Sequence, residues 1–178
     1  TPVTGLDHID LDACERRGIR VVSLRGETDF LRGVRATAEL TLAIALALLR
    51  RIPAAAASVR AGAWDRDRFR GHELHGTTAG VVGVGRLGEI VAGYLRALGM
   101  EVLGHDPRPV LPAGVTRVAT LDELLARSDL VTLHVSYDPS TRHLIGAAEL
   151  ARLRPTAVLV NTSRGGVVDE RALLAALR

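Results

Sequence analysis

Apolar and polar positions follow two different patterns along the chain, and the change occurs near Ala79. Beyond that residue, short apolar runs alternate with segments of helical spacing. The apolar runs predict strands over Gly80–Val84, Glu101–Leu103, Val115–Val118, Leu130–Val135 and Ala157–Val160, and the other segments predict helices over Leu87–Leu98, Leu121–Ala126, Ala147–Leu153 and Glu170–Leu177. Apolar strands that alternate with helices indicate a parallel sheet covered on both faces. We therefore expect an α/β fold with a doubly wound parallel sheet.

The chain before Ala79 predicts fewer elements. Residues 1–26 predict a loop, a short helix over Leu11–Arg17 and a strand over Arg20–Ser23. Because a single strand needs neighbours, we expect this stretch to be the tail of a unit whose other strands lie upstream.

Val34–Arg51 is apolar almost all round, which predicts a helix buried between layers or between subunits, and Pro53 is expected to end it. Its most apolar part, Ala36–Leu49, is too short for a membrane span, which needs roughly 20 residues. The polar stretch Arg66–His75 predicts a connector. No basic segment leads into an apolar one after Thr1, so no signal peptide is visible and we expect a cytoplasmic protein.

Composition narrows the possible chemistry. The apolar fraction of 47% and the charged fraction of 24% are typical of a soluble globular protein. The single cysteine, Cys14, excludes an internal disulfide, and no histidine has metal-ligand spacing, so no metal site is expected. All 23 basic residues are arginine, which excludes a Walker-type phosphate loop and a Schiff-base lysine. The net charge is only +3 and the arginines are scattered, so we expect no nucleic-acid partner.

A glycine-rich turn, Gly83–Gly88, carries the strongest chemical signal. It joins a predicted strand to a predicted helix, and Asp106 follows at the end of the next strand. This is the fingerprint of a Rossmann-type dinucleotide-binding unit. Gly83 permits the tight turn, Gly85 lets the backbone approach a pyrophosphate, and Gly88 lets the helix pack close to the strand. The amides of the helix N-terminus would then face the phosphates.

Asp106 indicates which dinucleotide is preferred. Its carboxylate would accept hydrogen bonds from the adenosine ribose hydroxyls and repel a 2′-phosphate, which favours NAD over NADP. Arg108 lies two residues further on and partly offsets that repulsion. NADP therefore stays a less favoured alternative.

Arg164 is the candidate for substrate chemistry, because it directly follows the last predicted strand. Ligands of open parallel sheets bind beyond the carboxyl ends of the strands. A guanidinium there can pair with a substrate carboxylate and polarise an adjacent carbonyl. Position alone leaves a surface ion pair equally open.

A series of motifs resembles the D-isomer-specific 2-hydroxyacid dehydrogenases, and especially their phosphoglycerate-dehydrogenase-like branch. Besides the glycine fingerprint, these motifs are Thr4–Asp10, Ala36–Leu40, His105–Pro107, His134–Ser136, Pro139–Arg142 and Asn161–Asp169. They occur in order over essentially the whole chain. Two positions depart from the pattern, since Val3 stands where relatives have Gly or Ser, and Ser136 where proline is usual.

The resemblance implies two Rossmann-like domains, with the cofactor domain inserted into a flavodoxin-like substrate domain, and a homodimer built around the cofactor domain. Residues 1–26 would be the end of the first substrate-domain segment. Residues 27–178 would be an incomplete NAD-binding domain, with 34–70 as crossover helix and dimer-contact region.

The resemblance also implies hydride transfer between a nicotinamide and C2 of a 2-hydroxy or 2-keto acid, such as phosphoglycerate, glyoxylate or hydroxypyruvate. Thr4 and Gly5 fall in the loop that holds the substrate carboxylate, and Arg164 matches the catalytic arginine. The positions that match cofactor contacts are Thr37, Gly83, Gly85, Arg86, Leu87, Gly88, Asp106, His134, Val135, Ser136, Thr141, Thr162 and Ser163.

The catalytic glutamate and histidine of the family follow the arginine, and no histidine in this sequence matches that position. We therefore expect residues 1–178 to be inactive by themselves. NAD-sensing transcriptional corepressors share the same fold and motifs, so a cofactor-dependent binding protein remains the alternative to an enzyme.

Overall fold

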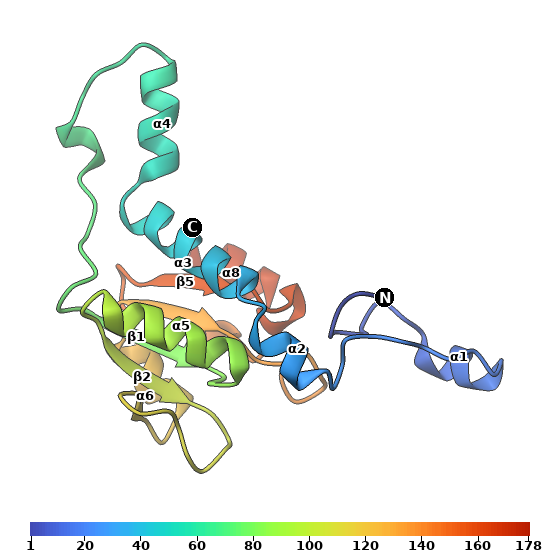
Figure 1. Ribbon diagram of the computed structural model, residues 1–178. Coiled ribbons are helices and arrows are strands. Elements are labelled where there is room, and N and C mark those ends of the chain that lie inside the picture. Colours follow the sequence, from blue (N-terminus) through green and yellow to red (C-terminus); the bar gives the residue numbers. More distant parts are fainter.

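The computed structural model describes residues 1–178 and contains a five-stranded parallel sheet in the order β3-β2-β1-β4-β5 (Figure 1). The strands are β1 (Thr78–Val82), β2 (Glu101–His105), β3 (Thr116–Arg117), β4 (Leu130–Leu133) and β5 (Val158–Asn161). The chain builds the sheet outward from β1 to β3 and then returns to the other side of β1. The expected doubly wound α/β fold is confirmed. Ligands of such sheets bind where the strand order reverses, here beyond the carboxyl ends of β1 and β4.

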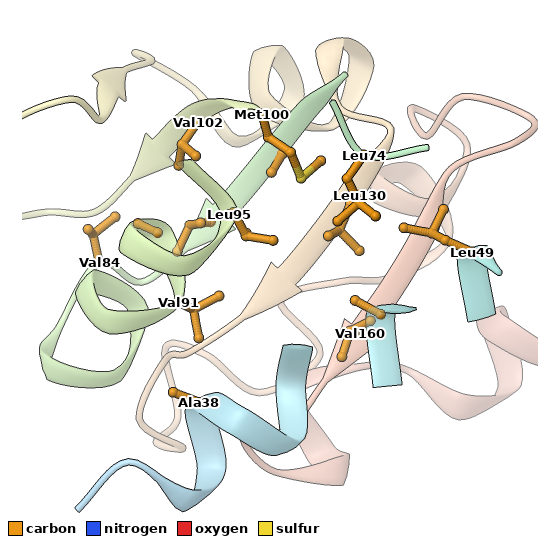
Figure 2. Packing of buried hydrophobic residues seen from close by; sticks show 14 residues of the cluster. Ala38, Leu49, Leu74, Val84, Val91, Leu95, Met100, Val102, Leu130 and Val160 are labelled. Atoms are coloured by element: carbon orange, nitrogen blue, oxygen red, sulfur yellow. The ribbon is translucent and has the colours of Figure 1, made fainter. Parts of the chain in front are cut away.

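Helices cover both faces of the sheet. They are α3 (Ala36–Leu49) and α5 (Arg86–Ala97) on one face, and α6 (Leu121–Arg127), α7 (Ala147–Leu150) and α8 (Glu170–Ala176) on the other. Figure 2 shows the core beneath α3 and α5, which includes Val91, Leu95 and Val160. Val81 belongs to this core and Val82 to the opposite one, because successive strand side chains point to opposite faces.

Three helices lie outside these layers: α1 (Leu11–Arg16), α2 (Thr28–Arg32) and α4 (Ile52–Arg60). Neither α1 nor α4 contains a buried residue. In Figure 1, α4 projects from the end of α3, and α1 lies at the far end of the molecule from the sheet. Two short 3-10 turns complete the elements, at Asp67–Phe69 and Gly165–Val167.

The strand expected over Arg20–Ser23 does not form. The segment instead runs beside the first residues of the chain and makes two backbone hydrogen bonds with them. The amino group of Thr1 donates to the Val22 carbonyl at 2.9 Å, and the Leu24 amide donates to the Val3 carbonyl at 3.1 Å. Two bonds to one irregular neighbour are too few for a regular ladder.

The expected role of Pro53 is wrong. Helix α3 already ends at Leu49, and the chain turns at Arg51, which has a left-handed φ of 54°. Pro53 then lies in the first turn of α4, where a missing amide proton costs no helical hydrogen bond. The predicted strands Gly80–Val84 and Leu130–Val135 also ended two residues too late, since both segments turn out of the sheet after β1 and β4.

No single helix combines the length and the hydropathy of a membrane span. Only the pair Thr28–Leu49 and Ile52–Arg60, which is bent by 64°, meets both criteria together.

Candidate cofactor and substrate site

A cleft of about 1020 Å³ lies beyond the carboxyl ends of the strands, between their loops and residues 2–12. Its position is the one that the strand order predicts for a ligand. The predicted site residues that line it are Thr4, Gly5, Thr37, Arg86, Leu87, His134, Val135, Ser136, Thr162, Ser163 and Arg164. The structure thus brings residues of five separate motifs to one cavity. Gly83, Gly85, Gly88, Asp106 and Thr141 are not part of its lining.

The turn between β1 and α5 has the geometry that its glycines predict. Gly83 has a φ of 82°, and a Cβ there would lie 2.9 Å from the His134 carbonyl group. A Cβ on Gly88 would lie 2.1 Å from the Gly83 carbonyl oxygen, so α5 reaches the strand only with glycine at this position. Beside Gly85 there is open space. The first amides of α5 have no partner inside the helix and are available to an anion at this opening.

The side chain of Arg86, at the start of α5, is bonded to two carbonyl groups near the end of α2. Its Nη1 donates to the carbonyls of Leu31 and Val34, each at 2.8 Å. The guanidinium therefore connects the glycine turn to the segment between α2 and α3. What Arg86 offers to a pyrophosphate in this arrangement is its backbone amide.

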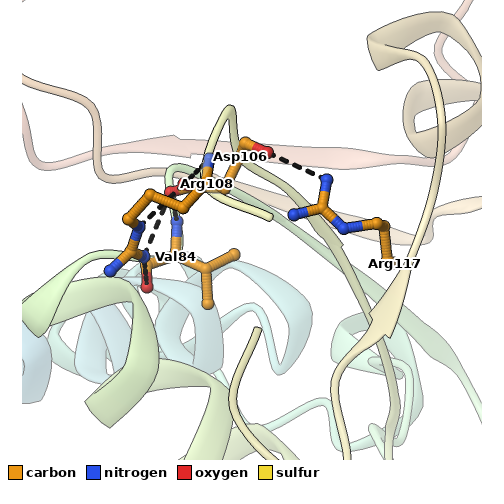
Figure 3. Close-up of polar contacts among 4 residues, drawn as sticks. All are labelled: Val84, Asp106, Arg108 and Arg117. Atoms are coloured by element: carbon orange, nitrogen blue, oxygen red, sulfur yellow. Dashed lines mark hydrogen bonds and ion pairs between the residues drawn. The ribbon is translucent and has the colours of Figure 1, made fainter. Parts of the chain in front are cut away.

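Asp106 lies at the end of β2 and is buried, with 7% of its surface exposed. Its carboxylate accepts the Val84 amide at 2.7 Å and the Nε of Arg108 at 2.9 Å (Figure 3). Arg108 also donates to the Val84 carbonyl. Burial alone would raise the pKa of Asp106, but the hydrogen bonds from Arg108 and from the backbone outweigh it and lower the pKa. The carboxylate stays ionised, with a guanidinium directly beside it.

His134 follows β4, is largely buried and lines the cleft. Its Nε2 lies 2.9 Å from the Thr132 hydroxyl. Burial lowers the pKa of His134 to about 4, so the ring is neutral at pH 7. A neutral imidazole in this place provides shape and a hydrogen bond rather than a charge.

Thr141 does not reach the cleft. Its hydroxyl donates to the Ser136 carbonyl at 2.7 Å and accepts the Asp138 amide at 2.9 Å. Thr141 therefore holds the loop after β4, and Ser136 lines the cleft from that loop.

A chain of hydroxyl groups fixes the loop after β5. Thr41, buried in α3, donates to the Thr37 carbonyl at 2.8 Å, so the Thr162 hydroxyl must donate to Thr41 across 2.7 Å. Asn161 accepts from the amide and the hydroxyl of Ser163. Thr41 and Asn161 were not among the predicted site residues. The Asn161–Ser163 turn has a sequence signal, since Asn commonly bonds the backbone two residues on, whereas the Thr41 contact has none.

Arg164 lies at the end of this loop and contacts the N-terminal segment. Its Nε donates to both carboxylate oxygens of Asp7, at 3.0 and 3.1 Å, and its Nη1 donates to the Ser163 carbonyl at 3.1 Å. A Cβ on Gly5 would lie only 1.9 Å from Nη2. The hydrogen bond from Arg164 is the main cause that lowers the pKa of Asp7. Asp7 belongs to the motif Thr4–Asp10, but no pattern in the sequence selects it as a site residue.

Comparison with known proteins places this geometry in a family. A family model described as D-isomer specific 2-hydroxyacid dehydrogenase, NAD binding domain, matches residues 42–178. The D-3-phosphoglycerate dehydrogenase of Methanocaldococcus jannaschii is 43% identical over 178 residues, which is 98% of this chain and 33% of that protein. The chain thus spans about a third of the length of the curated relatives it matches.

Two solved structures have the same fold. The D-lactate dehydrogenase of Aquifex aeolicus, complexed with NAD and lactic acid, superposes with a TM-score of 0.83 at 36% identity, over 98% of this chain and 52% of that one. An acyclic imino acid reductase in complex with NADPH and D-Arg gives 0.85 at 30% identity, over 98% and 55%. The family model covers most of the sequence and confirms the resemblance that the motifs indicated. The chain belongs to the D-isomer specific 2-hydroxyacid dehydrogenase family.

Proposed function

We propose that this chain is the cofactor-binding part of an NAD-dependent D-2-hydroxyacid dehydrogenase. The enzyme would transfer a hydride between the nicotinamide and C2 of a phosphoglycerate-, glyoxylate- or hydroxypyruvate-like acid. One observation carries the proposal: Arg164 and the Thr4–Gly5 loop share a single cleft with the first residues of α5. An arginine that can bind an acid therefore lies next to a glycine turn suited to a dinucleotide.

The glycine turn and the loops after β4 and β5 fit a dinucleotide. The open space beside Gly85 admits a pyrophosphate to the amides of Arg86 and Leu87. Asp106 would accept the ribose hydroxyls. The residues that would hold the nicotinamide end all line the cleft, namely Thr37, His134, Val135, Ser136, Thr162 and Ser163. When bound, the nicotinamide supplies or accepts the hydride.

Arg164 would bind and orient the acid. Its Nη groups, together with the backbone amides of Thr4 and Gly5, would hold the substrate carboxylate, and the guanidinium charge would polarise the C2 carbonyl. The D-lactate dehydrogenase that superposes on this chain is complexed with NAD and lactic acid, which supports an acid at this cleft.

Proton transfer would need a group from outside residues 1–178. His134 lies in the cleft, but its ring is neutral, buried and close to the Thr132 hydroxyl, so it is poorly suited to exchange a proton with a substrate. We therefore propose that these residues bind cofactor and acid, whereas turnover requires the longer protein. Residues 1–26 would belong to its substrate domain and residues 27–178 to its NAD-binding domain.

The longer protein would be a homodimer with residues 34–70 in the contact. Several large apolar side chains of this region are exposed, namely Leu40, Leu48, Ile52, Val59 and Trp64. Patches of this kind on α3 and α4 are typical of subunit interfaces.

We expect NAD to be preferred over NADP, because Asp106 stays ionised at the ribose position. The test is calorimetric titration of the full-length protein with NADH and with NADPH. Asp106→Ala should weaken NADH binding about tenfold and abolish the preference, whereas Glu101→Ala, at the exposed first residue of β2, should change neither affinity. Trp64 is 89% exposed in the segment after α4, so its quenching is a poor signal for this site. Absence of saturable NADH binding would contradict the proposal.

The alternative is an NAD-sensing corepressor of the same fold. The two functions differ in a direct assay: an enzyme oxidises a hydroxy acid, whereas a corepressor binds a short peptide with NAD-dependent affinity.

A further inference from the structure

Arg164 is oriented by a residue far from it in sequence. Asp7 lies 157 positions earlier, yet both of its carboxylate oxygens face the Nε of Arg164. No other side chain forms a hydrogen bond with this guanidinium; its other bond goes to the neighbouring Ser163 carbonyl. Asp7 is therefore the only side chain that fixes the direction of the arginine.

The contact determines which edge of the guanidinium is free. An arginine has five N–H donors and binds a carboxylate through either the Nε–Nη edge or the Nη1–Nη2 edge. The Asp7 carboxylate accepts the Nε–H, and the Ser163 carbonyl accepts one of the two N–H groups of Nη1. The three remaining protons are on Nη1 and Nη2. Nη2 lies against Gly5, where any side chain would displace it.

We propose that Asp7 is a positioning residue for Arg164, which holds the Nε edge so that the Nη1–Nη2 edge receives the carboxylate of the 2-hydroxy or 2-keto acid. The inference rests on the proposed function, since it assigns the geometry by which the same cleft takes its substrate. Asp7 also lines the cleft, but its carboxylate oxygens are bonded to Nε of Arg164, and we assign it no bond to the acid. Its charge would repel a substrate carboxylate at close range, so its benefit must come from orientation rather than from attraction.

The decisive variant is Asp7→Asn in the full-length protein. The asparagine side chain has the same shape as aspartate. In the wild type, the Nε–H of Arg164 faces two acceptor oxygens, whereas in the variant it would face one acceptor and one donor. We expect kcat to fall at least about tenfold with a smaller change in KM, because misplacing a reacting group costs rate more than affinity. Glu15→Gln removes a charge from the same segment, on exposed α1, and should leave both constants unchanged.

Gly5→Ala is a second, independent variant. It keeps the Gly5 amide but puts a methyl group where Nη2 lies and 2.8 Å from Oδ1 of Asp7, so it disturbs the Asp7–Arg164 contact sterically instead of chemically. The same loss of kcat is expected. Equal kcat in wild type and both variants would overturn the inference, and so would a change confined to KM, which would make Asp7 a purely electrostatic neighbour.

Crystal structures of the full-length wild type and the Asp7→Asn variant separate this inference from the proposed function. Arg164 should leave its place between Ser163 and Gly5, or occupy several rotamers, in the variant. An unmoved guanidinium would overturn the positioning role even if kcat falls. If the wild type reduces no 2-keto acid, the proposed function fails, and the two structures still decide whether Asp7 positions Arg164.

Discussion

Thr41 and Thr162 join their hydroxyl groups at 2.7 Å across 121 positions of sequence, and this contact ties α3 to the loop that carries Arg164. Because Thr41 is buried, a valine of the same shape would leave the Thr162 hydroxyl without its acceptor. Thr41→Val should lower the free energy of unfolding by about 1–2 kcal/mol, measured by urea denaturation. Thr116→Val, at an exposed position of β3, is the matched control. Equal urea midpoints for wild type and Thr41→Val would mean that the hydroxyl contact contributes nothing to stability.

Gly88 and Gly93 provide a matched pair within α5. A methyl group on Gly88 would collide with the Gly83 carbonyl oxygen, whereas nothing lies within 4 Å of one on Gly93. Gly88→Ala should destabilise the protein by about 1–3 kcal/mol and weaken NADH binding, because α5 must move away from the turn. Gly93→Ala should stabilise it by about 0.5–1 kcal/mol, because alanine favours a helix interior. Thermal unfolding of both variants checks the opposite signs, and destabilisation by both would refute the argument from close approach.

Arg108 should influence the choice of cofactor. Its guanidinium is half exposed and neutralises part of the Asp106 charge at the ribose position. Arg108→Ala should weaken NADPH binding by about tenfold and NADH binding much less, because only NADPH carries the 2′-phosphate. Titration with both cofactors measures the ratio, and Arg127→Ala, in the last turn of α6, serves as the control. A ratio that stays constant would exclude a role of Arg108 in cofactor choice.

His134 should make stability depend on pH. Burial lowers its pKa from 6.5 to about 4, so between these values the unfolded chain binds a proton that the folded chain does not. The contribution is complete above pH 6.5 and is lost as the pH falls toward 4, by up to about 3 kcal/mol. Urea unfolding at pH 7, 5.5 and 4.5 measures this slope.

His134→Gln should flatten that slope, whereas His8→Gln, at an exposed position, should preserve it. An identical slope in wild type and His134→Gln would assign the pH dependence to other groups.

A charge among the exposed apolar side chains of α3 should weaken the proposed subunit contact. Leu48 is 49% exposed, and a glutamate at this position would have to be buried if two copies of the full-length protein meet on this face. Leu48→Glu should shift the dimer toward monomer in sedimentation velocity. Val110→Glu, at a 78% exposed position in the loop between β2 and the edge strand β3, should not change the mass. A Leu48→Glu variant that remains fully dimeric would place the subunit contact elsewhere.

The sequence was sufficient to predict the sheet and the cofactor turn, because both depend on local patterns. Apolar runs identified all five strands, and Gly83, Gly85 and Gly88 identified the β1–α5 turn. Helix α4 was missed because none of its residues is buried, so no buried face gives its sequence a helical period. Helix α2 was missed because five residues are too few for a helical period to appear.

The partners of the site side chains could not be predicted in the same way. The contacts of Arg164 with Asp7, of Thr41 with Thr162 and of Arg86 with Leu31 connect segments that only the folded sheet brings together. Residue type and spacing indicate which side chains are chemically suitable. Packing between distant elements decides which partner each of these side chains contacts.

The side chain of Arg86 connects the glycine turn to the segment between α2 and α3. Arg86 is the first residue of α5, and its Nη1 also donates to the carbonyls of Leu31 and Val34, in the segment that joins α2 to α3. The segment between α2 and α3 connects residues 1–26 to the sheet. An anion that orders the start of α5 would therefore also order the segment between α2 and α3. By reciprocity, a contact that orders this segment would strengthen anion binding by the same factor. One residue, Arg86, would thus connect the proposed phosphate site to the segment that leads to residues 1–26.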